Sequence, residues 1–190
     1  MTTGNHNDRG ITTYPTRGRM EGKMIKRMMA SAMLDTATYE EVEADSSATA
    51  QAIAVVVLVS LATGIGTFRT GGVVGLMVGI PVSIGLWALW AWITYFVGTT
   101  ILKTAETKAN WGQLARTLGF AQSPGVLKAV GFIPGIGPLF FAIASIWQLA
   151  AMVIAIRQAL DFTSTWRAVG VAIIGFIPYA LATYIIYALI

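Results

Sequence analysis

The sequence predicts an all-α fold, a polytopic transmembrane helix bundle with four to five membrane segments and a broken third segment. Of its 190 residues, 55% are hydrophobic and only 12% are charged, whereas a soluble domain carries about a quarter charged residues. The mean hydropathy is +0.67. The charges are unevenly placed, because residues 51–190 hold only 7 of the 13 basic and 2 of the 9 acidic side chains. Lipid is therefore the expected solvent for this part of the chain.

The same composition excludes several classes of function. The chain has no cysteine, which excludes thiol chemistry and cysteine-ligated metals. Its apolar segments contain no Asp, Glu or His, so carboxylate catalysis within the membrane is not supported. The net charge of +4 does not indicate nucleic-acid binding, because most basic residues lie at the edges of apolar segments. We expect no catalytic, cofactor-binding or metal-binding residues.

The first 45 residues are predicted to form a tail and then a cytosolic helical segment. Residues 1–20 are polar without apolar periodicity, which is typical of a disordered tail with His6 in solvent. Residues 21–45 are predicted to form an amphipathic helix followed by an acidic capped turn. Over 21–34, apolar residues recur at helical spacing opposite a basic side (Met24, Ile25, Met28 and Met29 against Lys23, Lys26 and Arg27).

Two interpretations of this amphipathic helix stay open. In the first, the helix lies on a membrane surface, with its apolar side in the acyl boundary and its basic side chains on lipid phosphates. In the second, the helix packs on the cytosolic surface of the protein itself. Flexible methionine side chains also suit the groove of a partner protein.

The segment 35–45 contains five carboxylates in eleven residues. Thr38 and Glu41 have the spacing of a capping box, which predicts a helix start at Thr38, and Asp45 is expected to cap the next helix. The segment is interpreted as a solvated turn or as a docking surface. Together with the loop before the last span, it supplies the cytosolic docking candidates Tyr39, Glu40, Glu41, Glu43, Asp45, Arg157, Asp161 and Arg167.

Two long uncharged runs predict the first two membrane spans. Residues 46–68 suffice to cross a hydrocarbon core of about 30 Å at 1.5 Å per residue. A short turn is expected at 69–72. The second span, 72–102, is longer than the core requires, which predicts a tilt, a kink at Pro81 or a protruding end.

Small residues recur at every fourth position of the second span. On a helix this spacing makes one smooth face, which lets another helix approach closely. The partner is expected to be the first span or a second copy of the chain. The residues of this helix-packing face are Gly71, Gly75, Gly79 and Ser83.

The third membrane segment, residues 112–131, is predicted to be irregular. Ser123 and Pro124 have the pattern of an N-cap and a first helical position. Non-helical backbone at membrane depth needs protein or water partners, so this segment is expected inside the bundle. Residues 133–156 and 167–190 are the remaining predicted spans. The residues that predict the membrane break are Gly131, Pro134, Gly135, Gly137 and Pro138.

The distribution of basic residues predicts the orientation. Eleven of the thirteen lie on the side of the N-terminus if five segments span, and ten do so if four span. Both counts favour a cytoplasmic N-terminus, and five spans is the preferred number. Lys128 is the one candidate for an intramembrane charge, and we expect it to reach an end of the bundle or to line a polar cavity. Arg157 and Asp161 are spaced for an ion pair on a helix.

Several sequence segments together resemble one family of membrane proteins. They are LDTATYEEVEAD at 34–45 leading through Gln51 into the first span, WGQLARTLG at 111–119, SPG at 123–125, IW at 146–147, and RQAL at 157–160 with TSTWRA at 163–168. Over roughly residues 24–185 the chain resembles the Yip-domain family of Rab/Ypt-interacting integral membrane proteins, and most of all its bacterial branch. The resemblance implies a small multi-pass protein with a cytosolic N-terminus and no catalytic residues. Eukaryotic members are linked to Rab GTPases, vesicle budding and membrane shaping, but the bacterial branch has no Rab pathway to serve.

We therefore expect a non-enzymatic multi-pass membrane protein that organises or scaffolds a membrane or its proteins. One alternative is a small-solute or lipid transporter or channel that uses the break at 131–138 as its pathway. Another is an accessory subunit of a larger membrane complex. The expected partners are the lipid bilayer and a membrane protein or a second copy of the chain, without nucleic acid or cofactor. The expected location is a bacterial cytoplasmic membrane.

Overall fold

The computed structural model describes residues 17–189, so most of the predicted tail, including His6, lies outside the described part. Within it the chain is helical and has no strand, which confirms the predicted all-α class. The helices are α1 (Arg17–Ala32), α2 (Thr36–Ala44), α3 (Ala48–Gly66), α4 (Phe68–Phe96), α5 (Trp111–Ala121), α6 (Gly137–Ala159) and α7 (Thr165–Leu189). A π-helical turn, η1 (Val97–Ile101), extends α4, and a 3₁₀ helix, η2 (Ser123–Phe132), follows α5.

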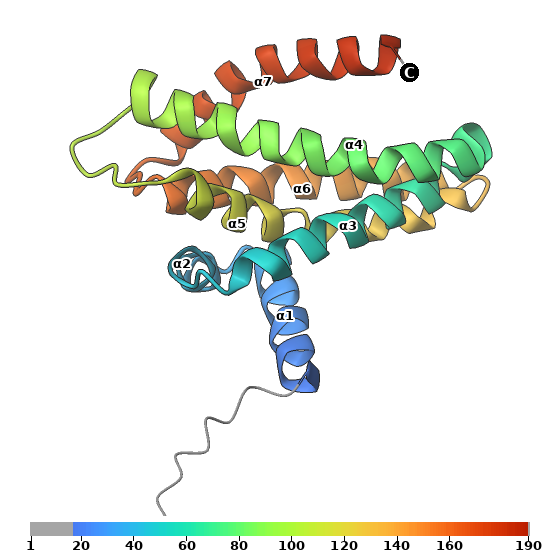
Figure 1. Cartoon of the computed structure of the whole chain (residues 1–190), viewed down its shortest axis with the longest axis horizontal. Coiled ribbons are helices and arrows are strands. Elements are labelled where there is room, and N and C mark those ends of the chain that lie inside the picture. Colours follow the sequence, from blue (N-terminus) through green and yellow to red (C-terminus); the bar gives the residue numbers. More distant parts are fainter. Residues whose placement is uncertain (1–16, 190) are drawn as a thin grey trace, which may run out of the picture.

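The long helices lie side by side and reverse direction at each end of the bundle (Figure 1). α3, the pair α5–η2 and α7 run one way, whereas α4 and α6 run back. The loops 102–110 and 160–164 share one end of the bundle, which we call the loop end. The turn at 67–72 and the loop 133–136 share the opposite end, which we call the turn end.

The third segment is broken, as predicted. In the described range, four helices are long and apolar enough to cross a membrane: α3, α4 with η1, α6 and α7. Between them runs an α-helix of 11 residues followed by a 3₁₀ helix of 10 residues. At about 1.5 and 2.0 Å per residue, the two pieces together extend over about 36 Å. The broken segment therefore passes from one end of the bundle to the other alongside four continuous helices.

Close contact with α3 and α6 encloses the broken segment. A Cβ added to Gly125 would lie 2.6 Å from Cγ1 of Val59, and one added to Gly131 would lie 3.1–3.4 Å from the backbone of Gly66. Glycine thus lets η2 lie directly against α3. This enclosure by protein is what irregular backbone at membrane depth requires.

The predicted turn between the first two spans is present at Gly72. This residue has φ = 57° and ψ = −159°, so the helical path of α4 is interrupted one turn after its start. An L-residue with a side chain rarely adopts this conformation, whereas glycine does so without steric cost. The regular part of the second span therefore begins after Gly72, close to the predicted boundary.

The predicted membrane break lies at the turn end of the bundle rather than in its middle (Figure 1). It is the loop between η2 and α6, in which Gly135 has φ = 86° and the N–H of Gly137 donates to the carbonyl of Ile133 at 2.8 Å. The helix type changes instead at Gln122, between α5 and η2. The sequence pattern of Ser123 and Pro124 pointed to this change, although the N-cap is Gln122 and the helix that follows is 3₁₀.

The small-residue face of α4 has no partner within the described chain. A Cβ added to Gly71, Gly75 or Gly79 would meet no heavy atom of another element within 4 Å. The first span, expected as one partner, instead places Gly66 against η2. Packing of this face against a second copy stays a prediction, and Ser83 lines an internal cavity.

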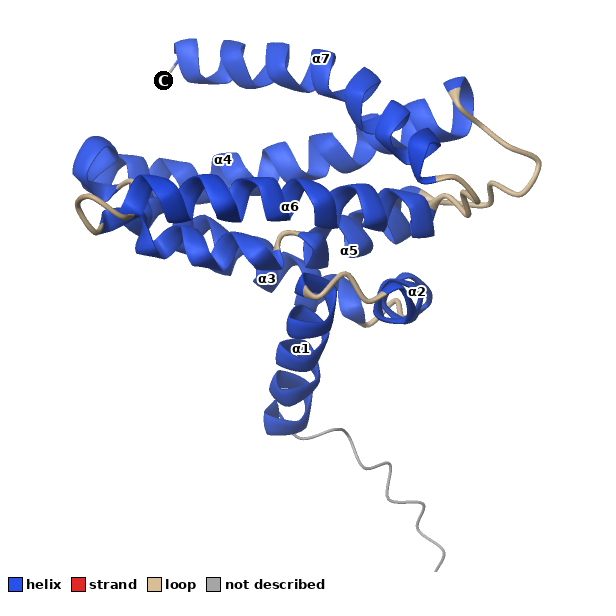
Figure 2. Cartoon of the chain, turned by 180° about the vertical axis from the view of Figure 1, so that it is seen from behind, coloured by secondary structure: helices blue, strands red, loops and turns tan. Residues whose placement is uncertain are grey.

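The helices α1 and α2 form an N-terminal hairpin, residues 17–44, on the side of the bundle (Figure 2). α1 extends away from the bundle across the direction of the long helices, and α2 packs against α5 and α6. α1 begins at Arg17, four residues before the expected start. The capping box predicted at Thr38 is wrong, because α2 begins at Thr36 with Asp35 as its N-cap. Thr38 donates its hydroxyl to the Asp35 carboxylate at 2.6 Å.

Candidate functional site

Arg27 holds the N-terminal hairpin together and joins it to the first span. Its guanidinium donates from Nη2 to Oε1 of Glu41 at 2.8 Å and to Oδ2 of Asp45 at 2.6 Å, and from Nη1 to Oε1 of Gln51 at 3.0 Å. The side chain is only 3% exposed. Because guanidinium presents several donors in a planar fork, one side chain connects α1, α2 and α3.

Two aromatic side chains fix the junction between α1 and α2. The hydroxyl of Tyr39, which is fully buried, donates to the carbonyl of Ser31 at 2.9 Å. The indole N–H of Trp147 in α6 donates to the carbonyl of Ala32 at 2.7 Å. Both bonds go to carbonyls in the last turn of α1, where the helical hydrogen-bond pattern ends. The orientation of α1 is therefore set by contacts with the rest of the protein.

Polar side chains of α5 and α6 secure α2. Arg116 donates from Nε to the carbonyl of Val42 at 3.1 Å and from Nη2 to the carbonyl of Glu43. A cation at the C-terminal carbonyls of a helix is stabilising, because these groups carry partial negative charge. Gln158 of α6 donates from Nε2 to Oε1 of Glu40 at 2.9 Å. The hairpin is thus anchored to α3, α5 and α6.

The structure brings the acidic docking candidates together, but most of them bind other side chains of the same protein. Glu41 and Asp45 bind Arg27, and Lys23 lies 3.3 and 3.4 Å from the same two carboxylates. Hydrogen bonds from Ser47 and then Arg27 hold the pKa of Asp45 well below its usual range. A docking role for Tyr39 does not fit its complete burial. A docking role for the four carboxylates stays a prediction.

Two of the three docking candidates near the last span, Arg157 and Arg167, form hydrogen bonds at the loop end. Arg157 and Asp161, both in the described range, do not form the expected ion pair, because α6 ends at Ala159 and Asp161 has φ = 53°. Arg157 donates instead to the carbonyl of Phe162 at 3.3 Å and to the Thr165 hydroxyl at 3.4 Å. Arg167 donates to the carbonyl of Leu102 at 3.4 Å.

The outer side of α1 is apolar. Ile25, Met29 and Met33 follow one another at intervals of four residues, and they are 53%, 62% and 79% exposed. Lys26 is exposed as well, whereas Arg27 and Ser31 face the protein. The predicted division into an apolar and a basic side therefore differs from the structure, in which Lys26 is exposed with Ile25 and Met29, whereas Arg27 is buried. No local pattern shows that Arg27 meets carboxylates 14 and 18 residues later.

Glu43 is expected to make folding depend on pH. Burial, assisted by the negative charge of Asp161, raises the pKa of Glu43 to about 7 from an ordinary 4.5. The folded protein therefore binds the proton more tightly than the unfolded chain, so stability falls as pH rises from about 4.5 to about 7. Glu43→Gln should remove this fall in stability and add about 1–2 kcal/mol to the free energy of unfolding at pH 8. This gain is smaller than the whole pKa shift would give, because the carboxyl keeps some contact with solvent.

Thermal unfolding of detergent-solubilised protein between pH 5 and pH 8 measures this effect. Glu106→Gln, an exposed carboxylate in the loop 102–110, is the control and should leave the pH profile unchanged. An identical pH profile for wild type and Glu43→Gln would contradict the prediction.

Comparison with known proteins gives one match. A family model described as the Yip1 domain matches residues 33–186. The matched part contains α2, α3, α4, the broken segment, α6 and all but the last residues of α7, whereas the whole of α1 precedes it. No curated protein and no solved structure matches the chain.

Proposed function

The chain belongs to the Yip1 domain family, and on this basis we propose that it is a non-enzymatic membrane-organising protein. The observation that carries the proposal is the exposed apolar row Ile25, Met29 and Met33 on a helix that the bundle holds in a fixed orientation. In this proposal the row enters the acyl boundary of one leaflet beside the bundle. The protein then acts on the bilayer by displacing lipid at a defined distance from its spans.

The direction of α1 supports lipid as the contact of this row. The four long helices have the length and composition of membrane spans, and α1 runs across them (Figure 1). If the long helices stand upright in the bilayer, α1 lies along its plane, as interfacial amphipathic helices do. The exposed Lys26 beside the apolar row is long enough to reach lipid phosphates.

The distribution of basic residues supports the orientation within this proposal. Eleven of the thirteen belong to the segment before α3, to the loop end or to the helices that start or finish there. By the positive-inside rule, the hairpin and the loop end then face the cytoplasm. The resemblance to the bacterial branch of the family supports a bacterial cytoplasmic membrane as the location.

A fluorescent probe at position 29 tests the lipid contact. The chain has no cysteine, so Met29→Cys gives a single attachment site for an environment-sensitive dye such as NBD. In reconstituted vesicles we expect a blue-shifted emission that is quenched by spin labels on the acyl chains. The control is Ala37→Cys, an exposed position on α2, where quenching should be weak. Equal quenching at the two positions would show that α1 does not enter the bilayer.

The effect on the membrane itself needs a second measurement. Reconstituted wild-type protein should change the size or shape of vesicles, as observed by electron microscopy, at a protein density where empty vesicles stay unchanged. The triple substitution of Ile25, Met29 and Met33 by serine should abolish this change while leaving the bundle folded. Vesicles that the variant and the wild type remodel equally would argue against α1 as the acting element.

Accessibility of single cysteines tests the orientation. Gly135 and Glu106 lie at opposite ends of the bundle, in the loops 133–136 and 102–110 (Figure 1). On intact cells, an impermeant maleimide should label Gly135→Cys, and it should label Glu106→Cys only after the cells are opened. The reverse pattern would invert the proposed orientation, and labelling of both positions from one side would contradict a bundle whose ends lie on opposite sides of the membrane.

A further inference from the structure

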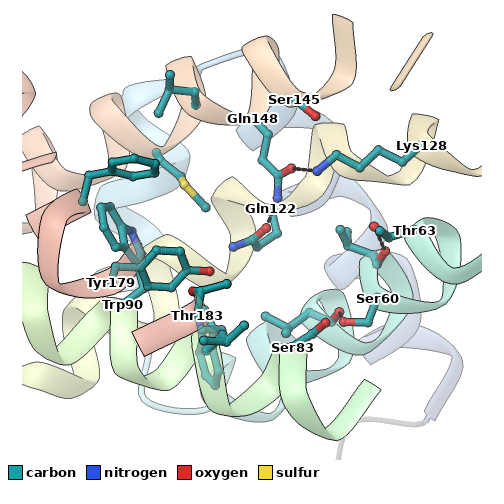
Figure 3. Close-up of a pocket in the computed structure, with 17 residues that line it drawn as sticks. Ser60, Thr63, Ser83, Trp90, Gln122, Lys128, Ser145, Gln148, Tyr179 and Thr183 are labelled. Atoms are coloured by element: carbon teal, nitrogen blue, oxygen red, sulfur yellow. Dashed lines mark hydrogen bonds between the residues drawn. The ribbon is translucent and has the colours of Figure 1, made fainter. Parts of the chain in front are cut away.

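A cavity with several polar side chains in its wall lies inside the bundle. Its volume is about 390 Å³, and α3, α4, η2, α6 and α7 all contribute to its wall (Figure 3). Ligand sites in proteins usually measure about 300–1,000 Å³. Hydroxyl, amide and ammonium side chains from these five elements converge on this space, although the helices around it are strongly apolar.

The side chain of Lys128 points into this cavity rather than toward the nearby end of the bundle. Its backbone lies against Gly66, the last residue of α3, at the turn end. The ammonium group, however, donates to Oε1 of Gln148 in the middle of α6 at 2.7 Å (Figure 3). A lysine near the end of a span normally reaches toward the interface, because a charge in hydrocarbon is costly. Its inward direction therefore indicates a use for the charge.

The wall of the cavity has positive charge and free donors but no anionic acceptor. None of the 17 described residues that line it is Asp or Glu. Gln148 donates in turn from Nε2 to Oε1 of Gln122, so hydrogen bonds connect Lys128, Gln148 and Gln122 along the wall. The side chains of Trp87 and Trp90 line the same cavity and are only 7% and 6% exposed, but their indole N–H groups expose almost no surface to it.

Among the described residues, the ammonium of Lys128 has only neutral partners: it donates to Gln148 and lies 5.2 Å from the centroid of the Phe141 ring. A charge in such surroundings without an opposite charge is costly to the folded protein by itself. A ligand rich in acceptor oxygens and carrying negative charge would remove this cost. A phosphate group has this chemistry, because it presents several strong acceptors in a compact anion.

The cavity reaches the lipid-facing surface of the bundle. Leu149 of α6 and Phe176 of α7 line it, and they are 57% and 59% exposed. These exposed side chains are apolar and belong to helices with the composition of membrane spans. A ligand that enters here comes from the bilayer and has an apolar part that can stay among these side chains.

We propose that the cavity binds the headgroup of one anionic phospholipid, with its phosphate near Lys128 and its acyl chains toward Leu149 and Phe176. Lys128 supplies the charge, and the amide of Gln122 supplies further donors. The site lies in the spanning part of the bundle and is independent of the lipid contact proposed for α1.

Lipid binding to purified protein in a non-ionic detergent tests the site. Native mass spectrometry and thermal unfolding should show one tightly bound phosphatidylglycerol and a raised unfolding temperature, with at least tenfold weaker binding of phosphatidylcholine. Lys128→Met should weaken phosphatidylglycerol binding at least tenfold, whereas Lys128→Arg should retain most of it. The control for loss of charge is Lys108→Met in the exposed loop 102–110, which should bind as wild type.

Equal binding of the two lipids, or wild-type binding by Lys128→Met, would overturn the proposal. If inorganic phosphate stabilises the protein and no lipid binds, the ligand is a soluble anion, and this result would overturn the lipid site.

Discussion

Arg27→Ala is expected to release the N-terminal hairpin from the bundle while the long helices stay folded. Arg27 is the only described side chain that binds α1, α2 and α3 together, through Glu41, Asp45 and Gln51. Its removal leaves two neighbouring carboxylates with only the exposed Lys23 for compensation. Loss of one partner from a buried ion pair costs about 3–5 kcal/mol, and since both carboxylates keep contact with solvent we expect about 2–4 kcal/mol here.

The accessibility of position 31 reports the release. Ser31 is fully buried where α1 meets the protein, so Ser31→Cys should react slowly with a maleimide in the otherwise native chain and at least ten times faster when combined with Arg27→Ala. Lys23→Ala is the matched control, because its exposed ion pairs are worth about 0–1 kcal/mol. Arg27→Lys should be intermediate, since one ammonium cannot reproduce the planar fork that bridges three acceptors. Slow labelling in the Arg27→Ala background would show that the other contacts, from Trp147, Arg116 and Gln158, suffice to hold the hairpin.

Gly66→Ala is expected to be the most damaging single change in the spans. A Cβ at this position would overlap the carbonyl of Lys128 and would approach the backbone of Gly131, so α3 and η2 would have to move apart. Backbone atoms cannot relieve such a contact by changing rotamer, and overpacking of this kind costs about 1–3 kcal/mol or more. We expect a large loss of folded protein and a lower unfolding temperature in mild detergent.

Other glycines of α3 and α4 provide the controls. Gly64→Ala, two residues earlier, meets mainly the flexible end of Leu76 and should cost less. Gly79→Ala meets nothing within 4 Å and should leave stability unchanged or raise it, because alanine favours a helix over glycine by about 1 kcal/mol. If Gly66→Ala unfolds at the same temperature as Gly79→Ala, the close approach of α3 and η2 is not a constraint on folding.

The same series tests the small-residue face of α4. Gly75 and Gly79 point at no part of the described chain, so a bulky residue there can only affect a partner. Gly79→Leu should therefore keep the monomer stable and shift a dimer in mild detergent toward monomer, as measured by size-exclusion chromatography with light scattering. An unchanged size distribution would mean that the face contacts lipid alone.

Much of the architecture was predictable because it depends on composition over long windows. Uncharged runs of more than 20 residues place the first two spans, and Gly72 marks the turn between them whatever the tertiary contacts are. The broken third segment was predictable for the same reason, since Pro124 and the glycines near it disfavour a continuous helix. The capping box was mislocated because Glu41, which the pattern assigns to a backbone N–H, is bound by Arg27 instead.

The candidate site was less predictable than the fold. The acidic residues of 35–45 were read as a surface, yet their main partners are Arg27 and Gln158, which lie far away in the sequence. The cavity shows the same difficulty. Lys128 was visible as an unusual charge, but nothing local indicated that it meets Gln148 or that both residues line one cavity.

The sequence by itself determined that this protein is a helical membrane bundle, where its spans and turns lie and which segment is irregular. These features follow from hydrophobicity and backbone preference, which act between residues close together in the chain. Only the tertiary structure decided which glycines are packing sites, that Arg27 is buried among carboxylates and that Lys128 faces a cavity. Each of these features depends on which helix lies beside which. In lipid, apolar side chains are as well solvated by lipid as by one another, so hydrophobicity does not select the neighbours. Close fit and the pairing of polar groups between distant residues select them instead.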